Sequence, residues 1–442
     1  MNTLYISSCV RDGGLYRCEL TEEGALRPCG VIPADRPMYA VWRDEILYVL
    51  EREPDADTHE SALRRFAVHP DGAYCELGTR QSTRGVCAPH LCVKDGAVYA
   101  VNYLSGSVCR IPDVVARHQG RSVHPTRQEA PHPHFITEAP DGVLLVTDLG
   151  LDRIVAYDAE LNRIAETALR PGSGPRHLAF SLDGRIVFCV NELSSTVCMY
   201  RYDGAGRMTL LDEQSALPED YAGESTAAAI RVDGEQIYVS NRGHDSIACL
   251  RAEGDALISD RFLPCHGTGP RDFDIVGDKI ICTNETSDSV TVLDKQTGRL
   301  LSELRLPRPL CVTVLPQGRK QVEVAGSQAA GFRPVMMAEG CTIGMINGFS
   351  GISEQGQKKT ERHRETDEVF IPIRGEAHLY IGLERKRVDL IPGNIYSVPK
   401  GVWHSFVSDE GGKVIVVEKK GTGPENSDYL MKEHAGKEGD KR

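Results

Sequence analysis

The chain has 442 residues, of which 40% are hydrophobic and 26% charged, a composition typical of a globular protein. Its formal net charge of −12 argues against a nucleic-acid partner, because phosphate contacts need a basic surface. No run approaches the ~20 apolar residues of a membrane-spanning helix. The first residues also lack the basic and apolar segments of a secretory signal. We therefore expect a cytoplasmic protein with no membrane partner.

Short apolar runs, expected to be β-strands, recur along the first three-quarters of the chain with a mean period of 46 residues. Asp-Gly pairs typical of tight hairpins, such as Asp95-Gly96 and Asp141-Gly142, precede several of them. The period fits one four-stranded propeller blade, which takes about 40–50 residues. The runs begin at Leu4, Leu47, Val98, Leu144, Val187, Ile237 and Ile280.

Seven such units predict an all-β fold in which residues 1–315 form a seven-bladed β-propeller. The first unit is incomplete, whereas residues 310–315 supply one additional strand. We expect that strand to join the N-terminal strand in one blade and so close the ring, which leaves only short, protected edges.

The strands of a blade alternate in direction, so residues before the first strand and after the second share one face. Polar residues gather at these positions, and we expect them to meet at one mouth of the central channel. Arginine binds carboxylate or phosphate through its planar fork, and a histidine or glutamate can activate water. The alternative is that these side chains only hold loops and blades together. The candidates are His90, His132, His134, Arg176, His177, Glu192, Arg242 and Arg271.

Three segments, residues 132–154, 174–197 and 239–247, resemble the seven-bladed propeller lactonase family, which includes 6-phosphogluconolactonases and carboxy-cis,cis-muconate cyclases. The resemblance implies that Arg176, Glu192, Arg242 and either His132 or His134 are catalytic. Spacing alone does not choose between the two histidines.

The resemblance further implies metal-independent hydrolysis of 6-phospho-D-glucono-1,5-lactone, a step of the pentose phosphate pathway. Arg271, His177 and His90 would then bind a small anionic sugar lactone or sugar acid. Two alternatives stay open. One is a muconate-type cycloisomerase, and the other is a propeller that binds a sugar acid without turnover, with the second domain as its sensor.

Residues 316–330 are small and polar and predict a linker. The next segment, residues 331–420, carries two motifs, Glu361-x-His363-x4-Glu368-x6-Gly375 and Gly393-x5-Pro399-x-Gly401-x2-His404. Together they resemble the cupin family, a small jelly-roll barrel whose members often pair, so a homodimer through this domain is one expectation. The last residues, 421–442, predict a solvated polar tail.

The cupin resemblance implies metal ligands at His363, Glu368 and His404, with Glu361 in the place of the family's usual first histidine. Residues 361 and 363 share one face of a strand, so Glu361 could also be a ligand. Such a set suits Fe, Mn, Ni or Zn. The alternative is a metal-free polar pocket.

Overall fold

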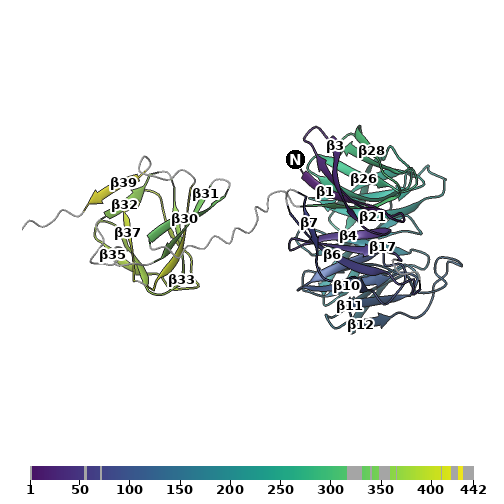
Figure 1. Ribbon diagram of the computed structural model, residues 1–442, viewed down its shortest axis with the longest axis horizontal. Helices are drawn as coiled ribbons and strands as arrows, with labels where there is room; N and C mark the ends of the chain where they lie inside the picture. The colour runs from purple at the N-terminus through teal and green to yellow at the C-terminus, as the bar shows by residue number, and fades with distance from the viewer. Residues whose placement is uncertain are drawn as a thin grey trace, which may run out of the picture. The chain divides into compact units, whose positions relative to one another are not determined.

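The computed structural model describes residues 2–53, 57–69, 72–315, 331–338, 341–347, 359–364, 366–409, 411–419 and 427–431. The chain divides into two compact units, residues 1–317 and 318–442. Every element in the described ranges is a β-strand, and none of these ranges contains a helix that could cross a membrane (Figure 1).

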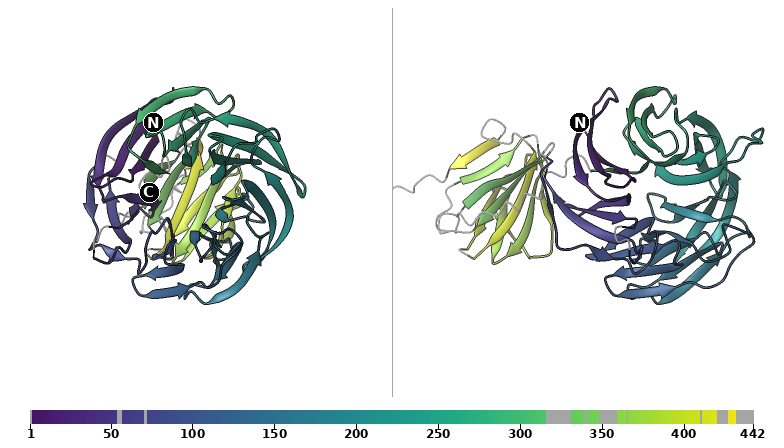
Figure 2. Two further views of the ribbon diagram at one scale, coloured as in Figure 1. Left: turned by 90° about the vertical axis from the view of Figure 1, so that its right-hand side faces the viewer. Right: turned by 45° about the vertical axis from the view of Figure 1, so that its right-hand side comes forward.

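The first unit is a seven-bladed β-propeller, as predicted, with seven antiparallel sheets arranged in a ring (Figure 2). Blade 1 contains β29 (Pro309–Val314), β1 (Asn2–Ser8), β2 (Gly14–Leu20) and β3 (Leu26–Pro33). Blade 2 contains β4 (Pro37–Arg43), β5 (Ile46–Glu51), β6 (Ala62–Val68) and β7 (Tyr74–Glu76), and β8 (Gln81–Ser82) also pairs with β6. Blade 3 contains β9 (His90–Lys94), β10 (Ala97–Asn102), β11 (Ser107–Ile111) and β12 (Val114–Arg117).

The remaining four blades follow the same order along the chain. Blade 4 contains β13 (Pro133–Glu138), β14 (Leu144–Asp148), β15 (Arg153–Tyr157) and β16 (Arg163–Ala168). Blade 5 contains β17 (Pro175–Phe180), β18 (Ile186–Asn191), β19 (Thr196–Gly204) and β20 (Arg207–Ser215). Blade 6 contains β21 (Thr226–Asp233), β22 (Gln236–Arg242), β23 (Ser246–Glu253) and β24 (Ala256–Pro264). Blade 7 contains β25 (Pro270–Val276), β26 (Lys279–Asn284), β27 (Ser289–Asp294) and β28 (Leu300–Arg305).

Blade 1 closes the ring with strands from both ends of the propeller, as the sequence predicted. Strand β29 pairs with β1 in an antiparallel register that sets Leu4 opposite Val314 and Ile6 opposite Val312. In Figure 2 the purple N-terminal strands and the green strands that precede residue 315 lie side by side. The first strands of successive blades contact one another around the ring, so they line the central channel.

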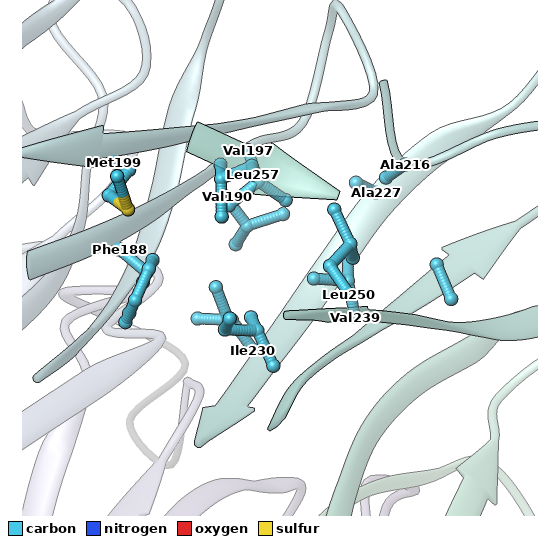
Figure 3. Packing of buried hydrophobic residues seen from close by; sticks show 12 residues of the cluster. Phe188, Val190, Val197, Met199, Ala216, Ala227, Ile230, Val239, Leu250 and Leu257 are labelled. Atoms are coloured by element: carbon cyan, nitrogen blue, oxygen red, sulfur yellow. The ribbon is translucent and has the colours of Figure 1, made fainter. Parts of the chain in front are cut away.

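The hydrophobic core is divided into layers between neighbouring blades. Figure 3 shows the layer between blades 5 and 6, where Phe188 and Val190 of β18 pack with Ile230 and Val239 of blade 6. Each blade contributes alternate side chains to the layer on either side, because successive residues of a strand face opposite ways. The strands that line the channel are therefore fixed by packing against both neighbouring blades.

The second unit contains two five-stranded sheets, as expected for the cupin barrel. One sheet has the order β30 (Gly331–Ala338), β31 (Cys341–Asn347), β38 (Lys413–Lys419), β33 (Glu368–Arg374) and β36 (Tyr396–Val398). The other has the order β35 (Lys386–Asp389), β34 (Ala377–Ile381), β37 (His404–Ser408), β32 (Lys359–His363) and β39 (Ser427–Met431). Buried side chains such as Phe370, Leu379 and Val416 form its core.

The prediction of a solvated tail over 421–442 is wrong for part of that segment. Strand β39 (Ser427–Met431) pairs along β32 and so belongs to the barrel. This pairing satisfies backbone groups that β32 would otherwise leave unpaired at a sheet edge, and a polar sequence can provide it because the bonds come from the main chain. The rest of the tail and the predicted linker over 316–330 lie outside the described residues.

Candidate functional site

The polar residues predicted to share one face of the propeller do converge there. The start of each inner strand lies opposite the end of the next strand, as in the pairs Pro175–Asn191 and Pro270–Asn284. Glu192 follows β18, and its backbone N–H donates to the carbonyl of Gly174 at 2.7 Å. The repeat itself therefore carries its polar side chains to the channel mouth.

Four of these side chains line a small pocket at the mouth. His134, Arg176 and Arg271 line it from β13, β17 and β25. Apolar groups such as Met38 and Leu310 form another part of the wall. The buried carboxylate of Asp272 also lines the pocket and pairs with Arg231 at 2.9 Å. The pocket therefore offers cationic and imidazole groups, and one paired carboxylate, beside an apolar surface.

Glu192 is the centre of an ion-pair cluster at this mouth. Its carboxylate lies 2.5 Å from Nη2 of Arg127, 3.0 Å from Nε of Arg176 and 3.1 Å from Nη2 of Arg242. The Glu192 and Arg176 side chains are 4% and 2% exposed, so water screens these charges little. The 3.0 Å pair with Arg176 is electrostatic only, because its Nε–H is not aligned for a hydrogen bond.

The cluster fixes the protonation of Glu192. Burial by itself raises the pKa of this carboxyl, but Arg242, Arg176 and Arg127 outweigh burial and hold the pKa well below its usual value. Glu192 is therefore an anion that anchors three guanidinium groups. Its low pKa also makes it a weak base.

Positive charge exceeds negative charge at the mouth. Burial, then the neighbouring Arg242 and Arg271, lower the pKa of Arg176 to about 9, so its positive charge is destabilised by the other arginines. Nε of Arg242 is buried without a hydrogen-bond partner among the described residues. An anion bound at the mouth would relieve the repulsion between the arginines and accept hydrogen bonds from their N–H groups.

Two histidines line the pocket in their neutral form. Burial, followed by Arg176, lowers the pKa of His134 and of His177 well below the usual value. Nη1 of Arg176 donates to Nε2 of His177 at 2.9 Å, so the proton of that ring lies on Nδ1. Nδ1 of His134 is buried and has no hydrogen-bond partner in the described part of the chain. His134 is thus a neutral, pocket-lining imidazole whose Nδ1 makes no hydrogen bond.

The other predicted histidines lie apart from the pocket lining. The ring of His132 stacks on Tyr103 with centroids 4.3 Å apart, and its Nδ1 lies 3.0 Å from the Tyr103 carbonyl oxygen. His90 packs between Tyr39 and Phe135, with ring centroids 4.2 and 4.0 Å away. Of the two histidines that the sequence could not separate, the geometry favours His134 as the catalytic candidate.

Sequence reasoning missed Arg127 and did not anticipate the pairing of Arg271. Arg127 lies in the loop before β13, outside the repeated strand pattern, and only its position shortly before the His-Pro-His segment hinted at a role. Arg271 pairs with Glu285 at 3.1 Å, and Glu285 also pairs with Arg308 at 3.1 Å. The mouth therefore has two groups of arginines, each paired with its own carboxylate, and each group contributes one arginine to the pocket lining.

The cupin unit brings together all four of its predicted metal ligands. Donor atoms of Glu361, His363 and His404 lie within 4.8 Å of one another, and so do those of His363, Glu368 and Glu418. Oε2 of Glu368 lies 3.2 Å from Nε2 of His363 and 2.7 Å from Nε2 of His404. Glu418, on β38, was not predicted from the motifs.

Neighbouring groups orient these histidines. Nδ1 of His404 donates to the carbonyl of Val402 at 3.1 Å, and Nδ1 of His363 bonds the hydroxyl of Ser427 on β39 at 2.8 Å. Both rings therefore direct Nε2 towards Glu368, the arrangement that ligating histidines usually show. The donor set fits a divalent metal, because it combines buried imidazoles with carboxylates.

Proton sharing within this cluster shifts its pKa values. Burial raises the pKa of Glu368, but hydrogen bonds from His363 and His404 outweigh it and lower the pKa to about 2. Burial and the nearby Glu368 raise the pKa of Glu418 to about 7. In this arrangement, protons on the histidines compensate the carboxylate charge that a metal cation would otherwise neutralise.

Comparisons with known proteins agree with this fold. The family described as seven-bladed β-propeller lactonases matches residues 3–314, and the cupin domain family matches residues 350–418. An uncharacterized protein of Staphylococcus epidermidis is 30% identical over 332 residues, which cover 67% of this chain and 94% of that protein.

Two solved structures cover the propeller. A protein from Lactobacillus plantarum has 27% identity and a TM-score of 0.65, covering 72% of this chain and all of its own. The periplasmic gluconolactonase of Pseudomonas aeruginosa has 25% identity and a TM-score of 0.64, covering 71% of this chain and 99% of its own. With a family match over residues 3–314 and the fold observed, this chain belongs to the seven-bladed β-propeller lactonase family, with a cupin domain following the propeller.

Proposed function

We propose that the propeller hydrolyses the ester bond of a small anionic lactone, with 6-phospho-D-glucono-1,5-lactone as its substrate. One observation carries the proposal: a neutral, buried His134 with an unpartnered Nδ1 shares a pocket with an arginine cluster of excess positive charge. Membership of the lactonase family and the similarity to a gluconolactonase support the reaction class.

In the proposed mechanism His134 accepts a proton from water, and the resulting hydroxide attacks the lactone carbonyl carbon. Arg176 and Arg242 stabilise the oxyanion of the tetrahedral intermediate, a task suited to donors held in a buried site. The ring C–O bond then breaks, and the leaving alkoxide takes the proton from His134. Glu192 acts as a positioning residue for the arginines, because its low pKa makes it a poor base.

The phosphate preference rests on the second group of arginines. Arg271 lines the same pocket as Arg176 but pairs with Glu285. One group would hold the reacting carbonyl while the other holds the distal phosphate. A neutral lactone has no phosphate for the second group of arginines to bind. We therefore expect turnover to favour the phosphorylated substrate.

The test is acid release from freshly prepared 6-phosphogluconolactone and from glucono-1,5-lactone, with the full chain and corrected for spontaneous hydrolysis. We expect His134→Gln to lower kcat/KM by roughly 10²-fold or more, as loss of a general base does. His69→Gln, at an exposed histidine, serves as the matched control. No rate above background would refute the lactonase assignment, and an unimpaired His134→Gln would refute the role of His134.

We also propose that the cupin cluster binds a divalent metal, one of Fe, Mn, Ni or Zn, through Glu361, His363, Glu368 and His404. Such an ion would supply Lewis-acid chemistry to a group bound at the cupin. The propeller mechanism uses no metal, so a chelator should leave lactone hydrolysis intact. Chelator-sensitive hydrolysis would instead assign the reaction to the cupin.

A further inference from the structure

Glu418 occupies an unusual place in the cupin barrel. It lies on β38, where Val414 and Val416 are buried in the core at 0% and 1% exposure. Because side chains alternate along a strand, Glu418 continues the face of these two valines and directs a carboxylate towards the barrel interior. A carboxylate at an inward position needs a compensating partner.

The partner of this carboxylate is the donor cluster. The Glu418 carboxylate lies within 4.8 Å of donor atoms of His363 and Glu368. Within the described ranges, no lysine or arginine forms an ion pair with Glu418. The two groups of donors share His363, and Glu368 also contacts His404, so the five side chains form one continuous set.

The number of donors suits a six-coordinate ion. With metal–oxygen distances of about 2.1 Å, neighbouring ligands of an octahedron lie about 3.0 Å apart and opposite ligands about 4.2 Å apart. Within each of the two groups of three donors, the atoms lie within 4.8 Å of one another, so a shared ion is within reach of both groups, and the five donors together exceed the four that a tetrahedral site needs. Zinc in proteins is instead satisfied by four ligands in a tetrahedron.

Resting on the proposed metal site, we infer that Glu418 is itself a ligand and that this cupin favours an octahedral Mn²⁺ or Fe²⁺ centre. Three carboxylates and two imidazoles form a harder donor set than the three histidines and one glutamate on which the motif is usually built, and carboxylate oxygens suit Mn²⁺. Five side-chain donors leave one position of an octahedron for water or a substrate oxygen.

The test measures Mn²⁺ and Zn²⁺ binding to the full chain after metal removal, by calorimetry and by the EPR signal of free Mn²⁺. In Glu418→Gln we expect the Mn²⁺ affinity to fall at least ~10-fold. Substituting residues that only hydrogen-bond the metal ligands already lowers metal affinity by about 10–100-fold. The Zn²⁺ affinity should fall less, since four donors remain. Glu384→Gln, an exposed glutamate in the β34–β35 turn, is the control and should bind both metals as the wild type does.

Equal losses for the two metals, or no loss, would overturn the inference. Glu418→Asp keeps a carboxylate and should retain more Mn²⁺ affinity than Glu418→Gln. A measurement on the unmodified protein avoids any folding defect: Co²⁺ at the site should give the weak visible bands of octahedral coordination, and intense tetrahedral bands would contradict the proposal. A wild-type chain that binds no metal would refute the metal site itself, whereas binding that is indifferent to Glu418 would refute only this inference.

Discussion

Replacing Glu192 by glutamine tests whether the propeller mouth is an anion site. The substitution keeps the shape of the side chain and removes the charge that Arg127, Arg176 and Arg242 share at 2.5–3.1 Å. A unit charge pair 4 Å apart is worth about 4 kcal/mol at an effective dielectric constant of ~20. Removing one partner of a buried ion pair costs about 3–5 kcal/mol, and we expect a loss of this size.

This loss converts into a shift of the propeller's melting temperature. An unfolding entropy of about 2.1 cal/mol/K per residue gives ~0.7 kcal/mol/K for the unit that spans residues 1–317, and hence a fall of about 4–8 °C. Scanning calorimetry of the full chain measures it. Glu160→Gln, at a carboxylate whose side chain is 68% exposed, should change stability by no more than about 0.5 kcal/mol.

Two further readouts separate the charge of Glu192 from packing. Inorganic phosphate should raise the melting temperature of Glu192→Gln more than that of the wild type, because the freed guanidinium groups take up the anion. The carboxyl of Glu192 has a lowered pKa, so its stabilisation is present above its ordinary value near 4.5 and is lost as the pH falls below that value. The difference between the two proteins should therefore narrow in acid. An unchanged melting temperature, indifferent to phosphate, would refute the reasoning.

Three other predictions concern the base, the position of an arginine and the ring closure. His134 has a lowered pKa and must be neutral to act, so kcat/KM should hold down to pH 6.5 and decline only below it; a decline beginning above pH 6.5 would contradict this role. Gly243→Ala should lower kcat/KM by roughly 10–100-fold, because a Cβ there would lie 2.3 Å from the Glu224 carbonyl oxygen and displace Arg242, whereas Gly254→Ala meets no atom within 4 Å and is the control. Ile6→Ala, in the fully buried pairing of β1 with β29, should cost about 2–5 kcal/mol in denaturant unfolding, and a cost below ~1 kcal/mol would mean that closure contributes little.

The repeat made the propeller predictable from sequence, since blades 3 to 6 all repeat a strand, an Asp-Gly turn and a strand that ends at the mouth. Asp95 and Gly96 show the reason: both adopt positive φ, 49° and 77°, as a tight hairpin between antiparallel strands requires. Because the chemistry sits at fixed points of the repeat, Arg176, Glu192 and Arg242 could be placed together before the structure was known.

Features outside the repeat and the motifs could not be found in this way. Arg127 reaches Glu192 from an irregular loop, and no periodicity governs where such a loop folds. His132 and His134 both contact Tyr103, but His132 stacks on its ring at 4.3 Å whereas His134 meets it edge-on at 5.8 Å. This difference is a matter of side-chain direction and not of spacing. The position of Glu418 could have been inferred from the alternation that places Val414, Val416 and Glu418 on one face of a strand. It was missed because Glu418 lies outside the two cupin motifs. The cytoplasmic location and a homodimer through the cupin stay predictions.

The closure of blade 1 sets a condition on how the protein is made. Among the strands of the propeller β1 is synthesised first, but its partner β29 follows only after the other six blades have been synthesised. Until then β1 presents an unpaired inner edge, the feature through which nascent chains join one another. The first strand of the propeller is therefore the one that stays unpaired on its inner edge for longest during synthesis. A chain that ends before residue 309 would retain nearly every blade but leave this edge open to pairing with another chain.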